Sequence, residues 1–140
     1  MTQVIFFSRI DYYPYNMEQI CTKQTTPLHQ DWLRKLDFYH FELFILQEQL
    51  EEIVEENTES DISEKAGYFS NRLIIRKNHI DKLRNLIREN LDCLAFETSG
   101  EDDVENTLKI FDSLSKECAA QQQSVNELRK EFERFAIEWA

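Results

Sequence analysis

The chain has 140 residues, a formal net charge of −11 and a hydrophobic content of 41%. This length suits one domain, and the apolar content argues against disorder throughout. The acidic balance argues against nucleic acids and anionic membranes as partners, because both are bound through clustered lysine and arginine. With only 2 glycines and 2 prolines, the sequence favours long helices over a strand-rich fold.

The first 29 residues are rich in aromatic side chains but lack a clean helical period. They contain only a short apolar run, residues 4–7, and no basic leader, so we expect no signal peptide and a cytoplasmic protein. The segment is too apolar for a free tail. We expect it to pack on the rest of the chain or on a second subunit.

Three helices are predicted, at about residues 27–56, 61–95 and 101–138, because apolar residues recur there at alternating spacings of three and four. Thr26 and Pro27 begin the first helix, and residues 57–60 make the turn after it, where Asn57 is able to take the left-handed cap conformation. The predicted core stripes are Trp32, Leu36, Tyr39, Leu43, Leu46, Leu50 and Ile53; Ala66, Phe69, Leu73, Arg76, Ile80, Leu83, Ile87, Asn90 and Leu94; and Phe111, Leu114, Cys118, Gln121, Val125, Leu128, Phe132, Phe135 and Trp139.

The predicted fold is all-α. Because the connections between the helices are short, consecutive helices are expected to be antiparallel neighbours. We therefore expect residues 30–140 to form an elongated antiparallel three-helix bundle with coiled-coil-like packing.

The first predicted helix also carries apolar residues on the side opposite its stripe: Phe38, Phe41, Phe44 and Ile45. A helix that is apolar on two sides is covered on two sides. The cover is supplied either within the chain, by the third helix and the N-terminal segment, or by a second subunit or another protein partner. In the second case these four residues would anchor an interface.

Three stripe positions are polar, namely Arg76, Asn90 and Gln121. A polar residue at a core position often fixes helix register or oligomeric state, and this is the role we predict. Arg76 has two alternatives, which are to extend its guanidinium to solvent or to pair with a glutamate such as Glu42.

The segment His79-Ile80-Asp81-Lys82 places a lysine one helical turn after a histidine. This pair resembles the histidine phosphotransfer domains, which are small acidic helical bundles. The resemblance would make His79 the phosphoacceptor and Lys82 the residue that steadies the phosphoryl group. Leu83 stands where that family usually has glycine, and its bulk is expected to crowd a docking receiver domain.

Metal and cofactor chemistry have little basis in the sequence. Asp37-x-x-His40 is the nearest approach to a di-iron motif and occurs once, so we expect no metal and no cofactor. The cysteines, Cys21, Cys93 and Cys118, are odd in number and widely spaced, which is not a disulfide framework.

The pattern Phe69-x-Asn71-Arg72-Leu73-Ile74-Ile75-Arg76-x-x-x-Ile80-Asp81-x-Leu83, with Trp32 and Leu36 upstream, resembles small uncharacterised bacterial helical-bundle proteins of similar length. The resemblance covers the first two predicted helices and leaves out the N-terminal 29 residues. It implies a helical bundle and supplies no activity.

The expected function is therefore that of a protein-interaction or assembly module without catalytic activity, and we expect a homodimer. Two alternatives stay open: a histidine phosphotransfer-like signalling domain, and a bundle that binds a ligand or a metal.

Overall fold

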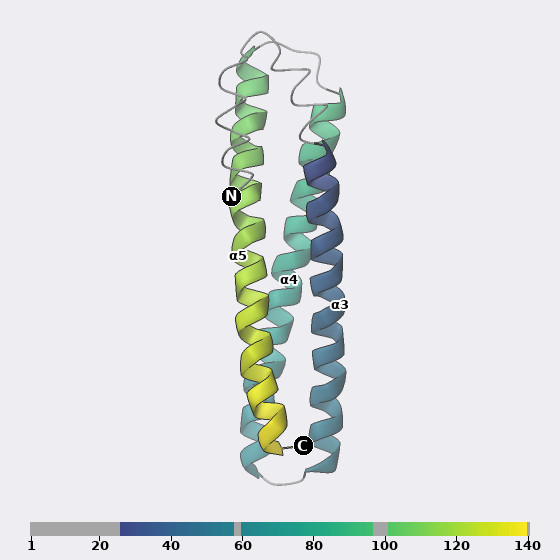
Figure 1. Ribbon diagram of the computed structural model, residues 1–140, viewed down its shortest axis with the longest axis vertical. Helices are drawn as coiled ribbons and strands as arrows, with labels where there is room; N and C mark the ends of the chain where they lie inside the picture. The colour runs from purple at the N-terminus through teal and green to yellow at the C-terminus, as the bar shows by residue number, and fades with distance from the viewer. Residues whose placement is uncertain (1–25, 58–59, 97–100, 140) are drawn as a thin grey trace. The chain divides into compact units, whose positions relative to one another are not determined.

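The computed structural model describes the backbone of residues 26–57, 60–96 and 101–139, and the side chains of residues 27–57, 61–93 and 105–139. This part of the chain consists of three helices, α3 (Thr26–Glu56), α4 (Ser60–Phe96) and α5 (Glu101–Trp139) (Figure 1). Every described residue except Asn57 is helical. The predicted all-α class is confirmed, and the helix bounds lie within one residue of those predicted.

Several predicted features lie outside the described residues. They are the aromatic segment up to residue 25, Cys21, and the side chain of Leu94. The bounds predicted for the N-terminal segment, up to residue 29, and for the first helix overlap, and residues 26–29 form the first turn of α3.

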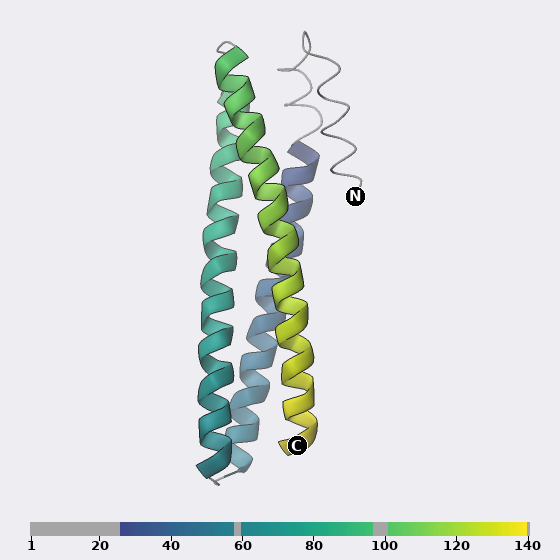
Figure 2. The ribbon, with the colours of Figure 1, turned by 90° about the vertical axis from the view of Figure 1, so that its left-hand side faces the viewer.

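The helices contribute to two compact units. Unit 1 contains residues up to Lys35 and residues 83–118, and unit 2 contains residues 36–82 and 119–140. Each unit therefore takes a part of every helix, and within each unit the three helices pack against one another. In unit 2 the C-terminal part of α3, the N-terminal part of α4 and the C-terminal part of α5 lie side by side in both ribbon views (Figure 1, Figure 2).

The predicted apolar stripes form the core of unit 2. Its largest fully buried side chains include Leu43 on α3, Leu73 on α4 and Phe132 on α5. Each such side chain contributes about 1.5–3 kcal/mol relative to an exposed position. The other buried apolar residues of unit 2 are Leu36, Tyr39, Leu46, Leu50, Ile53, Ile62, Ala66, Phe69, Ile80, Val125, Leu128 and Phe135.

The core of unit 1 centres on an aromatic cluster. Trp32 of α3 and Phe111 of α5 are both buried, and their ring centroids lie 4.7 Å apart. Around them are the buried apolar side chains Leu83, Ile87, Leu108 and Leu114.

Asn57 caps the end of α3. Among the described residues no non-glycine residue has a positive φ, so Asn57 does not use the left-handed conformation that it is able to take. The side chain acts as the cap instead. Its Nδ2 donates to the Ile53 carbonyl at 2.8 Å and to the Trp139 carbonyl at 3.3 Å, which ties the end of α5 to the end of α3 within unit 2.

Within the described residues, no helix carries an apolar stretch of the length and hydropathy that crossing a lipid bilayer requires.

Candidate functional site

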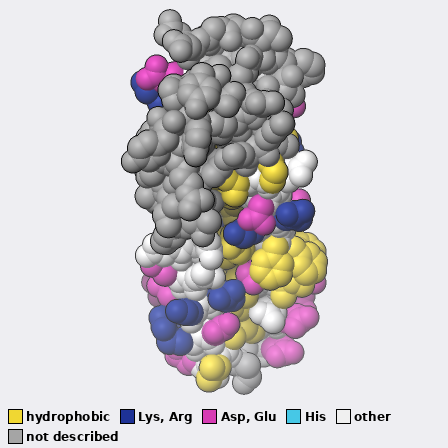
Figure 3. Space-filling view, turned by 45° about the horizontal axis from the view of Figure 1, so that its top comes forward, with side chains coloured by type: hydrophobic (Ala, Val, Ile, Leu, Met, Phe, Trp, Pro, Cys, Tyr) yellow, Lys and Arg dark blue, Asp and Glu magenta, His cyan; other side chains and the backbone are white. Residues whose placement is uncertain are grey.

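An aromatic face, made of Phe38, Phe41, Phe44 and Ile45, lies on α3 opposite its buried stripe. The exposed fractions of these side chains are 56%, 59%, 46% and 38%. Hydrophobic side chains reach the surface beside acidic ones on the described part of the molecule (Figure 3). Single exposed apolar residues are ordinary, but a cluster of four large ones on two helical turns is typical of an interaction surface.

The buried side of α3 explains why these four residues stay outside. Tyr39, Leu43 and Leu46 occupy the same turns and are buried. A helix turns by about 100° per residue, so one helix cannot direct both sets of side chains into the same core. Of the two alternatives for the aromatic face, cover by the third helix is not found, because the described part of α5 leaves these side chains exposed.

The predicted buried polar residues form two pairs, one in each unit. In unit 2, Arg76 Nη1 of α4 donates to Gln121 Oε1 of α5 at 3.0 Å. In unit 1, Asn90 Oδ1 of α4 lies 2.7 Å from His29 Nε2 of α3. A buried polar pair across two helices favours one register, because a shift would leave both groups buried without each other.

Arg76 differs from the prediction in two respects. It is half-buried rather than buried, whereas Asn90 and Gln121 are 4% and 6% exposed. Its alternative partner, Glu42, accepts instead from Arg129 of α5, whose Nη1 lies 3.1 Å from Oε1 and 3.3 Å from Oε2. The sequence identified the right positions but not the pairing, because several bases are within reach of one glutamate.

His29 is the residue that the sequence analysis missed. It is fully buried, and its ring lies 5.4 Å from Trp32 and 5.1 Å from Phe111 between centroids. Position 29 lies where the predicted N-terminal segment and the first predicted helix overlap, and the predicted core stripe begins only at Trp32. Its spacing of three and seven residues before Trp32 and Leu36 was the available signal, since it extends the apolar stripe by one turn.

His79 and Lys82 both lie exposed on α4. Leu83 is buried, so its expected crowding of a docking surface is wrong. The phosphotransfer alternative otherwise stays a prediction. His40 Nε2 lies 3.4 Å from Asp81 Oδ1 of α4, and the described residues contain no group of three or more His, Cys, Asp or Glu side chains placed to hold a metal ion.

Cys118, predicted in the core stripe, is half-buried on α5, and Cys93 is exposed on α4; both are free thiols. The pKa of the Cys118 thiol is raised from 9.0 to about 12, mainly by burial and also by the charge of Glu117, while Lys35 acts to lower it. This thiol is therefore a poor nucleophile at neutral pH.

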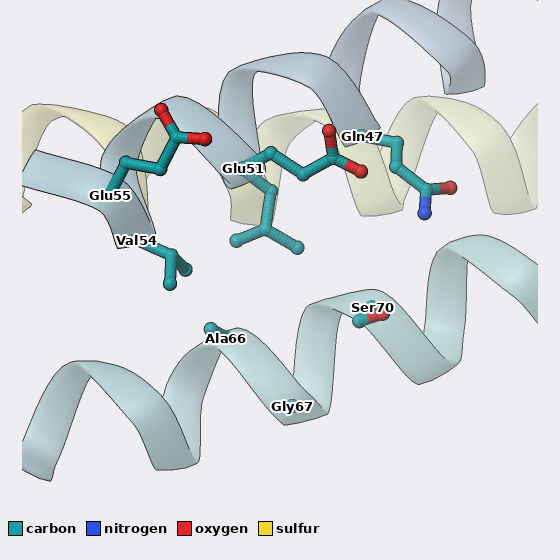
Figure 4. A pocket seen from close by; sticks show the side chains of 8 residues that line it. Gln47, Glu51, Val54, Glu55, Ala66, Gly67 and Ser70 are labelled. Atoms are coloured by element: carbon teal, nitrogen blue, oxygen red, sulfur yellow. The ribbon is translucent and has the colours of Figure 1, made fainter.

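A groove of about 410 Å³ runs between α3 and α4 in unit 2. Val54 points across it toward α4, and Ala66 and Ser70 face it from α4 (Figure 4). The Glu51 side chain extends along α3, and the Glu55 carboxylate turns away from α4. The remaining lining residues are Gln47, Leu50 and Gly67. This groove could not be predicted from the sequence, because its lining comes from two helices.

Comparison with known proteins adds no relative: no protein-family model, no curated protein and no solved structure matches this chain.

Proposed function

We propose that this chain is a non-catalytic protein-interaction module that pairs with a second copy of itself through the aromatic face of α3. The observation that carries the proposal is the exposure of four large apolar side chains, from 38% to 59%, on two turns of one helix. Large aromatic side chains account for much of the binding energy of interfaces, because they bury a large area at low entropic cost.

The proposal includes three further features from the sequence analysis. We infer that the helices of one chain form an elongated antiparallel bundle with coiled-coil-like packing, which the three-and-four spacing of the buried residues supports. We infer membership of a family of small helical-bundle proteins. We also infer a cytoplasmic protein, since Cys93 and Cys118 are free thiols, the form that a reducing compartment maintains.

The first test is the mass in solution, from light scattering on a size-exclusion column at several concentrations. We expect twice the 16.8 kDa of one chain, and we expect Phe41→Asp to reduce it to that of a single chain. Because Phe41 is 59% exposed, the free energy of unfolding of the separated chain should change by no more than about 0.5 kcal/mol.

The matched control is Ile137→Asp, which introduces the same charge at an apolar side chain that is 82% exposed on α5. It should leave the mass unchanged. A wild-type mass of one chain at every concentration would refute self-association.

A further inference from the structure

The groove between α3 and α4 differs from the aromatic face in shape and in charge. Its apolar part comes from Leu50 and Val54 of α3 and Ala66 of α4, and Val54 remains 39% exposed. Its α3 side extends from Gln47 to Glu55, which is about 12 Å along the helix axis and thus about two helical turns.

Gly67 is the exposed glycine among the α4 residues that line the groove. A Cβ atom built at this position would have no heavy atom within 4 Å. The space that a side chain would fill is therefore open, and a neighbouring helix can insert a large apolar side chain there. The flanking Ala66 and Ser70 are also small, so the backbone of that helix can approach α4 closely.

The rim of the groove is negatively charged. Residues 47–56 of α3 contain five glutamates and no lysine or arginine. Two of them, Glu51 and Glu55, line the groove. No ion pair between described residues involves either of them. Both side chains are exposed, so a cation of a partner can reach them.

We propose that this groove binds an amphipathic helix of another protein, with lysines or arginines beside its apolar stripe. A groove between two helices accepts a third helix by burying its apolar stripe. The charge of the rim selects a basic helix over an acidic one, because like charges across an interface are unfavourable. This site is independent of the proposed self-association through the aromatic face.

The probe is a fluorescein-labelled peptide of about 20 residues, long enough to form a helix. Its leucines are spaced by three and four, its other positions are lysine and alanine, and a second peptide has glutamate for every lysine. Binding is followed by fluorescence anisotropy. We expect saturable binding of the lysine peptide to the wild-type chain and none of the glutamate peptide.

The variant Glu51→Lys/Glu55→Lys should weaken binding of the lysine peptide by about tenfold or more, through the reversed charge at the rim. The control Glu52→Lys/Glu56→Lys makes the same change one residue further along α3, at exposed positions that do not line the groove. It should weaken binding far less. Equal weakening by the two pairs would show general attraction to an acidic protein and would overturn the site.

Gly67→Leu tests the apolar part without a change of charge, since the leucine fills the open space from the protein side. It should also weaken binding of the lysine peptide by about tenfold. Unchanged binding to Gly67→Leu, or failure of the lysine peptide to bind the wild-type chain, overturns the proposal. Phe41→Asp should bind the peptide as the wild type does. A failure of peptide binding can therefore be distinguished from a failure of self-association.

Discussion

At the scale of single residues, the two described cysteines differ in their environment. Cys93 is exposed on α4, whereas Cys118 is half-buried on α5 beside Glu117. A raised pKa means that the folded chain retains the Cys118 proton at pH values where the unfolded chain loses it. The thiolate is the reactive form, so the fold protects this thiol from alkylation and oxidation.

We predict that Cys118 reacts slowly with a maleimide or a disulfide reagent at pH 8. The measurement uses a Cys21→Ser/Cys93→Ser variant, in which only Cys118 of the 3 cysteines remains. A Cys21→Ser/Cys118→Ser variant, which retains Cys93, is the control and should react at the rate of an exposed thiol. Equal rates in the two variants would contradict the protection.

The same pKa predicts how stability depends on pH. Above pH 9 the unfolded thiol ionises, while the folded thiol stays protonated up to about pH 12. The free energy of unfolding therefore falls as the pH rises through this range. Below pH 9 both states keep the proton, so none of this stability is lost there. In Cys118→Ala this part of the decrease should be absent, as urea denaturation at several pH values will show.

The third residue-scale prediction concerns the pair of His29 and Asn90, whose Nε2 and Oδ1 atoms lie 2.7 Å apart in the core of unit 1. Asn90→Leu should lower the free energy of unfolding by about 1–3 kcal/mol, because His29 loses a buried partner. The double variant with His29→Leu should cost less than the sum of the two single changes. Urea denaturation of all four proteins measures the coupling, and additive effects would mean that the pair contributes nothing as a pair.

At the scale of the helix, α4 contains a glycine in its second turn where no turn or bend requires one. Gly67 has no positive φ, and a Cβ there would meet nothing within 4 Å. The backbone and the space around it would thus accept any residue, and glycine lowers helix stability relative to alanine.

We predict that Gly67→Ala raises the free energy of unfolding by about 0.5–1 kcal/mol. Ser63→Ala, at an exposed position one turn earlier in α4, should give a smaller increase. Serine forms helices better than glycine does, so its replacement by alanine gains less. Thermal and urea denaturation measure both. A loss of stability in Gly67→Ala would show that the backbone at this position is approached more closely than the structure indicates.

The helices could be predicted from the sequence more fully than the contacts between them. The buried positions of α3, from Trp32 to Ile53, follow directly from the spacing of apolar residues, because a helix presents one residue per turn to each side. The partners of the polar side chains do not follow. Arg129 rather than Arg76 contacts Glu42, and nothing in the spacing along one helix determines which base on another helix lies nearest.

At the scale of the whole molecule, the candidate sites were predictable only where one helix supplies them. The aromatic face belongs entirely to α3 and was identified from the sequence. The groove needs Val54 from α3 and Gly67 from α4, and the His29–Asn90 pair needs residues 61 positions apart. Such sites depend on the register between helices, which is a property of three-dimensional packing.

The division into two units has a practical consequence for optical measurements. The chain contains 2 tryptophans; Trp32 belongs to unit 1 and Trp139 to unit 2. Each unit therefore carries its own intrinsic fluorophore. Variants that keep one tryptophan and replace the other with phenylalanine would report the unfolding of each unit separately, and coincident transitions would mean that the two units lose their structure as one cooperative body.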